Sequence, residues 1–346
     1  MTFYTLRVIN IIKETEDTIT LCFKQPGLKK LKYSAGQYLT LVFRINGRRY
    51  VRPYSFSSAP GVDSLLEVTI KRVHGGLISN HVNDEVKIGD SIEAMEAMGD
   101  FTYNVNHASA TDNIFLWGAG SGITPLISIT KHILATDSSK KVTLVYGNRN
   151  HETVIFNEKI KQLQASFPSA FTAWHFHTRL VIDNQNPYLV QGRIDTKKAL
   201  SILENADVSN SLHYICGPLG LKESVKNALQ SKGIPDDHIK TEDFELIRDP
   251  KDFENIQTRF VNLHFEGQTT ILEVVKGKSI LEAGLDALLE LPYSCQTGNC
   301  ITCKGKLIAG AVKMIGINKL PDGLGKGEYL LCCSHPLTDN VQISIQ

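Results

Sequence analysis

The sequence predicts three domains in series: an antiparallel β-barrel, a doubly wound α/β domain and a small α+β domain. The chain of 346 residues is longer than a single domain with one hydrophobic core usually is. Its hydrophobic pattern changes from short alternating strands to units of strand, glycine loop and helix. Five of the seven cysteines fall at or after Cys295, which sets the end of the chain apart from the rest.

The barrel is predicted over residues 1–107, where short apolar runs alternate with turn residues. A single helix, Leu77–Val82, is expected to close one end. The expected strands are Phe3–Ile12, Thr18–Lys24, Tyr38–Ile45, Arg48–Ser57, Leu65–Arg72 and Ser91–Ala94.

The α/β domain is predicted over residues 108–245. It opens with an apolar strand at Ile114–Trp117, a glycine loop, and a helix at Pro125–Leu134, followed by a strand at Lys141–Tyr146. That order predicts a parallel sheet covered by helices. Further strands are expected at Phe171–Phe176 and His213–Cys216, and further helices at Val154–Phe167, Lys197–Glu204 and Leu219–Lys232.

The third domain is predicted over residues 259–346, after a polar connector at 246–258 that has the charge and lack of apolar period typical of a linker. Two strands, Phe260–Phe265 and Thr270–Val275, form a hairpin-like pair. A short helix at Ile280–Leu289 leads into a loop rich in cysteine.

Composition excludes some functions. The 37 basic and 36 acidic side chains nearly cancel, so no global field would recruit nucleic acid or an anionic membrane. No apolar run approaches the ~20 residues of a membrane span, and the N-terminus is typical of a strand rather than of a signal peptide. We therefore expect a cytoplasmic protein without membrane insertion, in which clustered cysteines indicate metal or redox chemistry rather than disulfides.

The cysteine loop has the spacing C-x4-C-x2-C at Cys295, Cys300 and Cys303. A fourth thiolate from a returning strand at Cys332 completes the plant-type pattern for a [2Fe-2S] cluster. Cys333 competes for the fourth role, and Pro336 favours Cys332 through a C-x-x-x-P ending. A Zn(Cys)4 site is the alternative, which the unequal spacings disfavour.

From about Phe260 onward the chain resembles plant-type ferredoxin domains, which implies a β-grasp fold. The segments Gly310–Met314 and Gly327–Cys332 share in that resemblance. Ile301 departs from it, because such loops usually carry Gly, Ala or Ser there. The departure implies a shift in the exposure or the potential of the cluster.

The segment Arg52-Pro53-Tyr54-Ser55 matches the R-x-Y-S motif of the ferredoxin-NADP reductase superfamily. Taken alone, Arg and Tyr on a strand usually cover a surface. The resemblance implies FAD, favoured over FMN. Arg52 would pair with the pyrophosphate, Tyr54 would lie against the ring and Ser55 would bond to N5, where hydride arrives.

A second segment supports this resemblance, because Lys71–Ser79 is similar to the flavin-phosphate segment of the same superfamily. Its glycines lead into a helix N-terminus, a place that favours anions. The residues expected to bind there are Lys71, Gly76, Leu77, Ile78 and Ser79.

The loop Gly118–Pro125 follows an apolar strand and opens a helix, so its backbone can approach a pyrophosphate. The alternative interpretation is that the glycines only allow the strand and the helix to pack closely. Together with the flavin motif it resembles the nicotinamide loop of ferredoxin-NADP reductases. The residues expected to bind there are Gly118, Gly120, Ser121, Gly122 and Thr124.

Two later segments belong to the same resemblance. Cys216-Gly217-Pro218 ends a strand at the carboxyl edge of the sheet, where ligands bind. Cys216 is expected to position the nicotinamide rather than to act as a nucleophile. Glu242 and Phe244 match an E-x-F segment that lies near the flavin ring, and the simpler interpretation of Phe244 is core packing.

The choice between NADPH and NADH depends on the end of the second strand, where an acidic residue would bind the ribose. This strand ends at Tyr146-Gly-Asn-Arg149, and an arginine suits a 2′-phosphate. We therefore expect NADPH rather than NADH, although Glu152 lies close by in the sequence.

The order of the three domains is similar to that of the reductase components of multicomponent oxygenases, those of the phenylacetyl-CoA epoxidase type in particular. The resemblance implies an oxidoreductase that passes electrons from NADPH through FAD and the cluster to a separate oxygenase component. A fatty-acyl desaturase, an aromatic-ring dioxygenase or a hybrid-cluster protein is the alternative acceptor. A non-catalytic redox sensor is the alternative from a different class.

Overall fold

The computed structural model describes residues 2–27, 29–103, 112–179, 186–204, 206–317 and 319–345. The chain divides into two compact units. One contains Met1–Leu41 and Tyr54–Asp243, and the other contains Val42–Pro53 and Phe244–Gln346. Among the described residues no helix is long and apolar enough to cross a membrane.

The predicted antiparallel barrel is confirmed. Its sheet has the order β4-β3-β6-β1-β2-β5, and an antiparallel bridge between Phe56, just beyond β4, and Val68 of β5 joins the two ends of this order. One helix, α1 (Leu77–Glu85), follows β5 as predicted. The strands are β1 (Phe3–Thr15), β2 (Thr18–Phe23), β3 (Tyr38–Ile45), β4 (Arg48–Ser55), β5 (Leu66–Lys71) and β6 (Ser91–Met95).

The doubly wound sheet is also confirmed, with six parallel strands in the order β10-β9-β8-β7-β11-β12. Its strands are β7 (Asn113–Ala119), β8 (Lys141–Asn148), β9 (Phe171–His177), β10 (Leu189–Gln191), β11 (Ser211–Cys216) and β12 (Ile239–Glu242). Its helices are α3 (Ile123–Thr136), α4 (Asn157–Ser166), α5 (Thr196–Glu204) and α6 (Leu219–Ser231).

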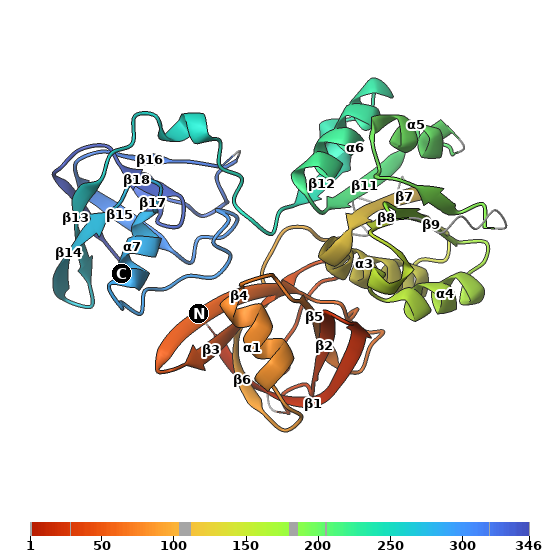
Figure 1. Ribbon diagram of the computed structural model, residues 1–346, viewed down its shortest axis with the longest axis horizontal. Helices are drawn as coiled ribbons and strands as arrows, with labels where there is room; N and C mark the ends of the chain where they lie inside the picture. The colour runs from red at the N-terminus through yellow and green to blue at the C-terminus, as the bar shows by residue number, and fades with distance from the viewer. Residues whose placement is uncertain are drawn as a thin grey trace. The chain divides into compact units, whose positions relative to one another are not determined.

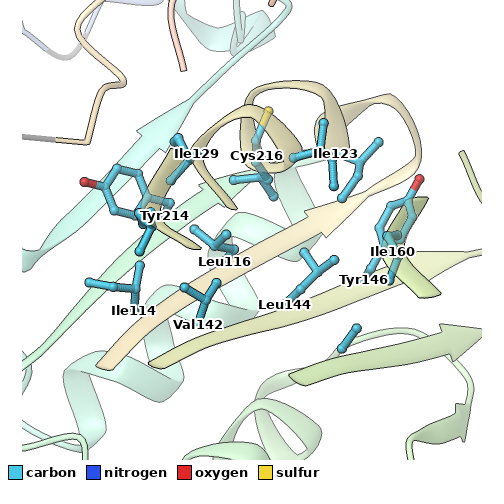
Figure 2. Close-up of a cluster of buried hydrophobic side chains, with 14 of the residues drawn as sticks. Ile114, Leu116, Ile123, Ile129, Val142, Leu144, Tyr146, Ile160, Tyr214 and Cys216 are labelled. Atoms are coloured by element: carbon cyan, nitrogen blue, oxygen red, sulfur yellow. The ribbon is translucent and has the colours of Figure 1, made fainter. Parts of the chain in front are cut away.

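Alternate residues of these strands point to opposite faces of the sheet and pack into two separate hydrophobic cores. Ile114 and Leu116 of β7 pack on the face covered by α3 and α4, whereas Phe115 and Trp117 pack on the face covered by α5 and α6 (Figure 1). Figure 2 shows the first core, in which side chains from β7, β8 and β11 meet Ile123 and Ile129 of α3. Both faces are buried, which explains the nearly continuous apolar runs of the sequence.

Three elements of the α/β domain differ clearly from the sequence-based expectation. Helix α4 begins at Asn157 rather than Val154, because Phe156 adopts a left-handed conformation with φ of 62° that interrupts the helical path. The strands β10 and β12 were not predicted. Both are short edge strands, three and four residues long, and so small a segment carries no readable period.

The C-terminal domain contains a mixed five-stranded sheet in the order β14-β13-β19-β15-β17 and a two-stranded sheet of β16 and β18. A capping box between Ser279 and Glu282 starts its helix, α7 (Ile280–Asp286). The strands are β13 (Arg259–Phe265), β14 (Gln268–Val274), β15 (Lys304–Ala309), β16 (Val312–Met314), β17 (Glu328–Leu330), β18 (Ser334–Pro336) and β19 (Val341–Ser344).

The polar connector expected at 246–258 makes specific contacts within this C-terminal unit. The Arg248 guanidinium donates to the carbonyl of Gly277 at 3.1 Å, and the Lys313 ammonium donates to the carbonyl of Asp252 at 3.2 Å. Ile256 is buried. This stretch, predicted as a linker, is thus attached to the C-terminal unit by hydrogen bonds and by a buried side chain.

Candidate redox site

The glycine loop predicted to bind the nicotinamide nucleotide lies at the carboxyl edge of the parallel sheet. It forms a short 3-10 helix at Gly120–Gly122 between β7 and α3, and no side chain caps the start of α3. The amide groups of this first turn therefore have no side-chain partner. Gly120 has φ of 54° and a Cβ there would meet no atom within 4 Å, so its backbone faces open space that a ligand can approach.

Gly122 has a different role, because two backbone segments meet at this position. A Cβ placed on Gly122 would lie 2.1 Å from the carbonyl oxygen of Cys216. Cys216 also pairs with Gly118 and, on its other side, with Glu242 in the parallel sheet. The structure thus brings together the loop, the Cys216–Pro218 segment and Glu242, as the sequence predicts.

Cys216 is buried, with an exposed fraction of 1%. Burial, together with the charges of Glu242 and Asp243, raises the pKa of its thiol well above the ordinary value. A thiol held neutral in this way is a poor nucleophile. The positioning role of Cys216 stays a prediction.

The chain turns away from the sheet directly after Glu242. Lys222 of α6 donates to both carboxylate oxygens of Asp243, at 2.7 and 2.6 Å, and only 11% of its side chain is exposed. This ion pair was not predicted from the sequence. Phe244, which was predicted to lie near the flavin ring, is 46% exposed and belongs to the C-terminal unit.

Helix α3 connects the nicotinamide loop to the barrel. The hydroxyl of the fully buried Ser128 donates to the carbonyl of Ser58 at 2.6 Å. Ser58 lies three residues beyond Ser55, the residue predicted to contact flavin N5. Phe56 pairs with Val68 of β5, and β5 also has Cα atoms within 8 Å of the 3-10 helix Gly120–Gly122. The segment that follows Ser55 therefore lies near the nicotinamide loop within the N-terminal unit.

The predicted flavin residues fall in both units. Tyr54 and the buried Ser55 belong to the N-terminal unit, whereas Arg52 and Pro53 belong to the C-terminal one. Arg52 donates to the carbonyl of Val51 at 2.8 Å and lines a cavity of about 500 Å³ together with Arg48 and Arg49. Glu282, Asp286 and Glu290 line the same cavity, so its charges balance. Pairing of Arg52 with a pyrophosphate therefore stays a prediction.

The second predicted flavin segment forms the start of α1. Gly76 is the N-cap and makes no side-chain cap hydrogen bond, so the first amides of the helix have no side-chain partner there. Ser79 accepts a hydrogen bond from the amide of Val73 at 3.0 Å, which folds the approach to the helix. Leu77 is exposed, whereas Ile78 is buried. Lys71 forms an ion pair of 3.5 Å with Asp17.

The four cysteines come together as two pairs of thiols. Cys295 is hydrogen-bonded to Cys300, and Cys303 is hydrogen-bonded to Cys332. The bond from Cys295 lowers the pKa of Cys300 to about 7, and the same bond raises the pKa of Cys295. Among the described residues no group of three or more His, Cys, Asp or Glu side chains gathers as for a single metal ion. Two thiolates for each of two irons is the ligand set of a [2Fe-2S] cluster.

Glycines let the cysteine loop fold tightly. Gly298 has φ of 78°, in the left-handed region, and Gly305 lies so close to Ile343 that a Cβ would approach that side chain to 2.7 Å. Cys332 lies in the turn between β17 and β18, not on a strand as expected, and its own backbone amide donates to the Cys303 sulfur. The donor set and the loop therefore fit the cluster.

Comparison with known families agrees with this geometry. Three family models match: the oxidoreductase FAD-binding domain over residues 5–103, the oxidoreductase NAD-binding domain over 116–227 and the 2Fe-2S iron-sulfur cluster binding domain over 263–337. One subunit of the 1,2-phenylacetyl-CoA epoxidase of Escherichia coli K12 is 32% identical over 99% of this chain and 97% of its own. The chain belongs to this family of reductase components.

Other members of the reductase family are similar over a comparable length. The ferredoxin reductase component of a 3-ketosteroid-9-alpha-monooxygenase from Rhodococcus rhodochrous is 32% identical, over 98% of this chain and 95% of its own. The solved structure of phthalate dioxygenase reductase superposes with a TM-score of 0.68 at 22% identity, covering 99% and 98% of the two chains, and shows the same fold. This reductase is accordingly an oxidoreductase with FAD-binding, NAD-binding and [2Fe-2S] domains.

Arg149 of this reductase lies exposed just beyond β8, as its sequence position predicts. Sequence reasoning missed a second arginine beside it. The amide of Arg179, just beyond β9, donates to the carbonyl of Arg149 at 2.6 Å, and its side chain is exposed too. The signal that marks Arg179 is its place two residues beyond the end of a parallel strand adjacent to β8. Two arginines thus have neighbouring backbone positions at the carboxyl edge of the parallel sheet, where nucleotides bind in such folds.

Proposed function

We propose that this reductase oxidises NADPH, holds FAD on its barrel and delivers single electrons through a [2Fe-2S] cluster to a separate oxygenase component of the phenylacetyl-CoA epoxidase type. The observation that carries the proposal is the Ser128–Ser58 hydrogen bond of 2.6 Å, because it joins the helix that follows the nicotinamide loop to the segment directly after Tyr54 and Ser55. A fixed spacing between donor and acceptor is what hydride transfer requires. We place this activity in the cytoplasm.

FAD held on the barrel would supply the change from two-electron hydride transfer to the single-electron steps that a [2Fe-2S] cluster takes. The chain's own residues orient these groups. Tyr54 would lie against the flavin ring and Ser55 would donate to N5, while Arg52 would bind the pyrophosphate. Cys216 and Glu242, paired across β11 and β12, position the nicotinamide.

Phosphate groups bind at the two uncapped helix starts, where amides lack side-chain partners and the helix dipole favours negative charge. Gly76–Ser79, with Lys71, hold the flavin phosphates. The loop Gly118–Thr124 and the segment Gly217–Pro218 hold the nicotinamide nucleotide, since Gly217 approaches the backbone of Ala119 closely. The four cysteines hold the cluster.

The first experiment is an anaerobic visible spectrum of the purified protein, followed by addition of NADPH or NADH. Overlapping flavin and iron–sulfur absorption that bleaches on addition of NADPH is the expected result. A protein that binds zinc and shows no iron–sulfur absorption contradicts the proposal.

Arg149 and Arg179 favour NADPH, because each charge-assisted hydrogen bond to a 2′-phosphate contributes about 1.5–3 kcal/mol. We expect Arg149→Ala and Arg179→Ala each to raise the KM for NADPH about 10- to 100-fold. The KM for NADH should stay unchanged, and Arg193→Ala, at another exposed arginine, should change neither. Equal effects on the two nucleotides would contradict a phosphate-binding role.

The epoxidase acceptor is proposed because the Escherichia coli relative, a subunit of such an enzyme, aligns over 99% of this chain. Reconstitution with the oxygenase subunits of a phenylacetyl-CoA epoxidase tests this directly. Turnover with these subunits, and none with an aromatic-ring dioxygenase or a ketosteroid monooxygenase component, is expected. Rapid reduction of cytochrome c would argue against a non-catalytic redox sensor. Only the reconstitution identifies the natural electron acceptor.

A further inference from the structure

A fifth cysteine lies beside the four proposed cluster ligands. Cys333 is fully buried, with an exposed fraction of 0%, and its sulfur lies 3.4 Å from the sulfur of Cys332. The same sulfur would be 3.3 Å from a Cβ on Gly298, so it also packs against the loop that carries the other three cysteines. Its position therefore depends on residues from both parts of the site.

The backbone holds Cys333 in this place from both sides. Its amide donates to the carbonyl of Leu330 at 3.1 Å, and its carbonyl accepts from the amide of Ile315 at 2.9 Å. These two backbone hydrogen bonds fix the turn between β17 and β18, and the turn sets the direction of the Cys333 side chain. The Cys333 thiol is therefore held in a fixed position beside the proposed ligands.

The other three proposed ligand sulfurs receive hydrogen bonds from amides or hydroxyls. The amide of Thr297 donates to Cys295 at 3.5 Å, and the amide and hydroxyl of Thr302 donate to Cys300. The amide of Cys332 donates to Cys303. Cys332 differs from these three, because the neighbour within hydrogen-bond distance of its sulfur, besides Cys303, is the thiol of Cys333.

The direction of this bond follows from the chemistry of a ligand. A cysteine bound to iron is a thiolate and has no proton to give. Either sulfur can donate in the contact itself. With Cys332 bound to iron, the proton would lie on Cys333, and its S–H group would donate to Cys332. Hydrogen bonds to cluster sulfurs are among the features that set the reduction potential.

We propose that Cys333 is a positioning residue for the cluster, whose thiol donates a hydrogen bond to the Cys332 sulfur and makes the reduction potential less negative. The inference rests on the proposed function, since it needs the cluster. On reduction one electron enters the cluster, no bond breaks, and the proton stays on Cys333. Because the added negative charge is spread partly over the sulfurs, the donor stabilises the reduced state more than the oxidised one.

The test is an electrochemical titration of the holoprotein followed by visible absorption and electron paramagnetic resonance, without nucleotide or acceptor. We expect Cys333→Ala to lower the ratio of reduced to oxidised cluster at a fixed potential about tenfold, which is about 59 mV for a one-electron couple. Cys333→Ser keeps a donor in the same place and should restore most of the wild-type value. Cys22→Ala, at a buried thiol of the barrel, is the matched control and should leave the potential unchanged.

Equal potentials for Cys333→Ala and the wild type would overturn the inference. A [2Fe-2S] spectrum retained by Cys332→Ala would overturn it as well, because Cys333 would then be a ligand. Should Cys333→Ala fail to hold a cluster, the infrared S–H stretch of the wild-type holoprotein, identified by its loss in Cys333→Ser, gives an independent readout. A band shifted to lower frequency relative to a free thiol supports the hydrogen bond, and an unshifted band overturns it.

The proposed function fails in a different way. If the wild-type protein shows no iron–sulfur signal at all, the function is contradicted and the inference with it. A different acceptor or a preference for NADH leaves the titration unaffected, because neither takes part in it.

Discussion

At the residue scale, Gly122 shows why one position in a glycine loop tolerates no side chain. The carbonyl of Cys216 occupies the place of its Cβ, and that carbonyl belongs to a parallel strand that cannot move alone. Gly120, two residues earlier, has no atom within 4 Å of its Cβ position. Within the same motif, one glycine allows packing and another leaves room for a ligand.

Gly122→Ala should therefore displace the loop from Cys216 and slow the reduction of the flavin by NADPH. A misplacement of about 1 Å costs on the order of 100-fold in rate. Stopped-flow absorbance of the flavin measures this. Gly220→Ala is the control, because Gly220 lies in α6 with open space around it, and that variant should be unchanged in rate and at most about 1 kcal/mol more stable. A rate equal to that of the wild type in Gly122→Ala would contradict the geometry.

Glu14 of β1 is a second residue whose environment has a measurable consequence. Burial raises the pKa of its carboxyl, against the opposing hydrogen bond from Thr20 and the charges of Lys131 and Lys159. The side chains of Glu67 and Asp63 are also near this cluster, and burial raises the pKa of Glu67 as well. The folded protein thus holds the Glu14 proton to a higher pH than the unfolded chain does.

The sign of the pH dependence follows. A raised folded pKa contributes stability that is fully present below the unfolded value, near 4.5, and is lost as the pH rises through the folded value. Glu14→Gln cannot ionise, so its melting temperature relative to the wild type should increase between pH 4 and pH 8. Calorimetry at a series of pH values measures this, with the exposed Glu16→Gln as control. A difference that stays constant with pH would contradict the raised pKa.

At the scale of elements, α3 combines two tasks. Its first turn borders the nicotinamide loop, and its middle binds the barrel through Ser128 and Lys131. The Lys131 ammonium lies 2.6 Å from a carboxylate oxygen of Asp63, with only 6% of the lysine side chain exposed. The helix is thus held to the barrel by buried polar contacts, which are more directional than apolar packing.

Lys131→Met should destabilise the N-terminal unit by about 3 kcal/mol, because it leaves the Asp63 charge without its buried partner. Chemical denaturation followed by flavin or tryptophan fluorescence gives the value. Lys161→Met removes an exposed ion pair with Glu158 on α4 and should cost less than about 1 kcal/mol. Similar losses in the two variants would show that burial does not matter here.

At the scale of the whole molecule, the chain forms two compact units that contain different steps of the proposed reaction. The nicotinamide loop, Tyr54 and Ser55 belong to the N-terminal unit, and all four cluster cysteines belong to the C-terminal unit. We therefore expect the proposed hydride transfer to the flavin to need no thiol of the cluster.

Cys303→Ala should separate the two steps. We expect loss of the [2Fe-2S] signal, because one thiol pair is broken, and loss of cytochrome c reduction down to the level that the flavin alone supports. The rate of flavin reduction by NADPH should remain that of the wild type. Stopped-flow absorbance and steady-state assays measure both rates, and a parallel fall in the two would show that the units are not independent.

Local patterns along the chain were enough to predict the number, order and class of the domains. Strand alternation, the strand–loop–helix order and the cysteine spacing can each be recognised in a short stretch of sequence. For the strands, this is because burial on a sheet gives the hydrophobic residues a short period along the sequence. Tyr38–Ile45 was predicted with the bounds that β3 has. The candidate loops also lie where the pattern placed them, at strand ends.

Which distant groups meet became clear from the folded chain alone. Cys332, not Cys333, is hydrogen-bonded to Cys303, and Arg179 lies beside Arg149 because β8 and β9 are neighbours. The carbonyl of Cys216 that excludes a side chain from Gly122 comes from a strand almost a hundred residues later in the chain. The cause is the same in each case. Contacts between segments far apart in sequence depend on which strands pair, and pairing is set by the packing of the whole sheet rather than by any local period.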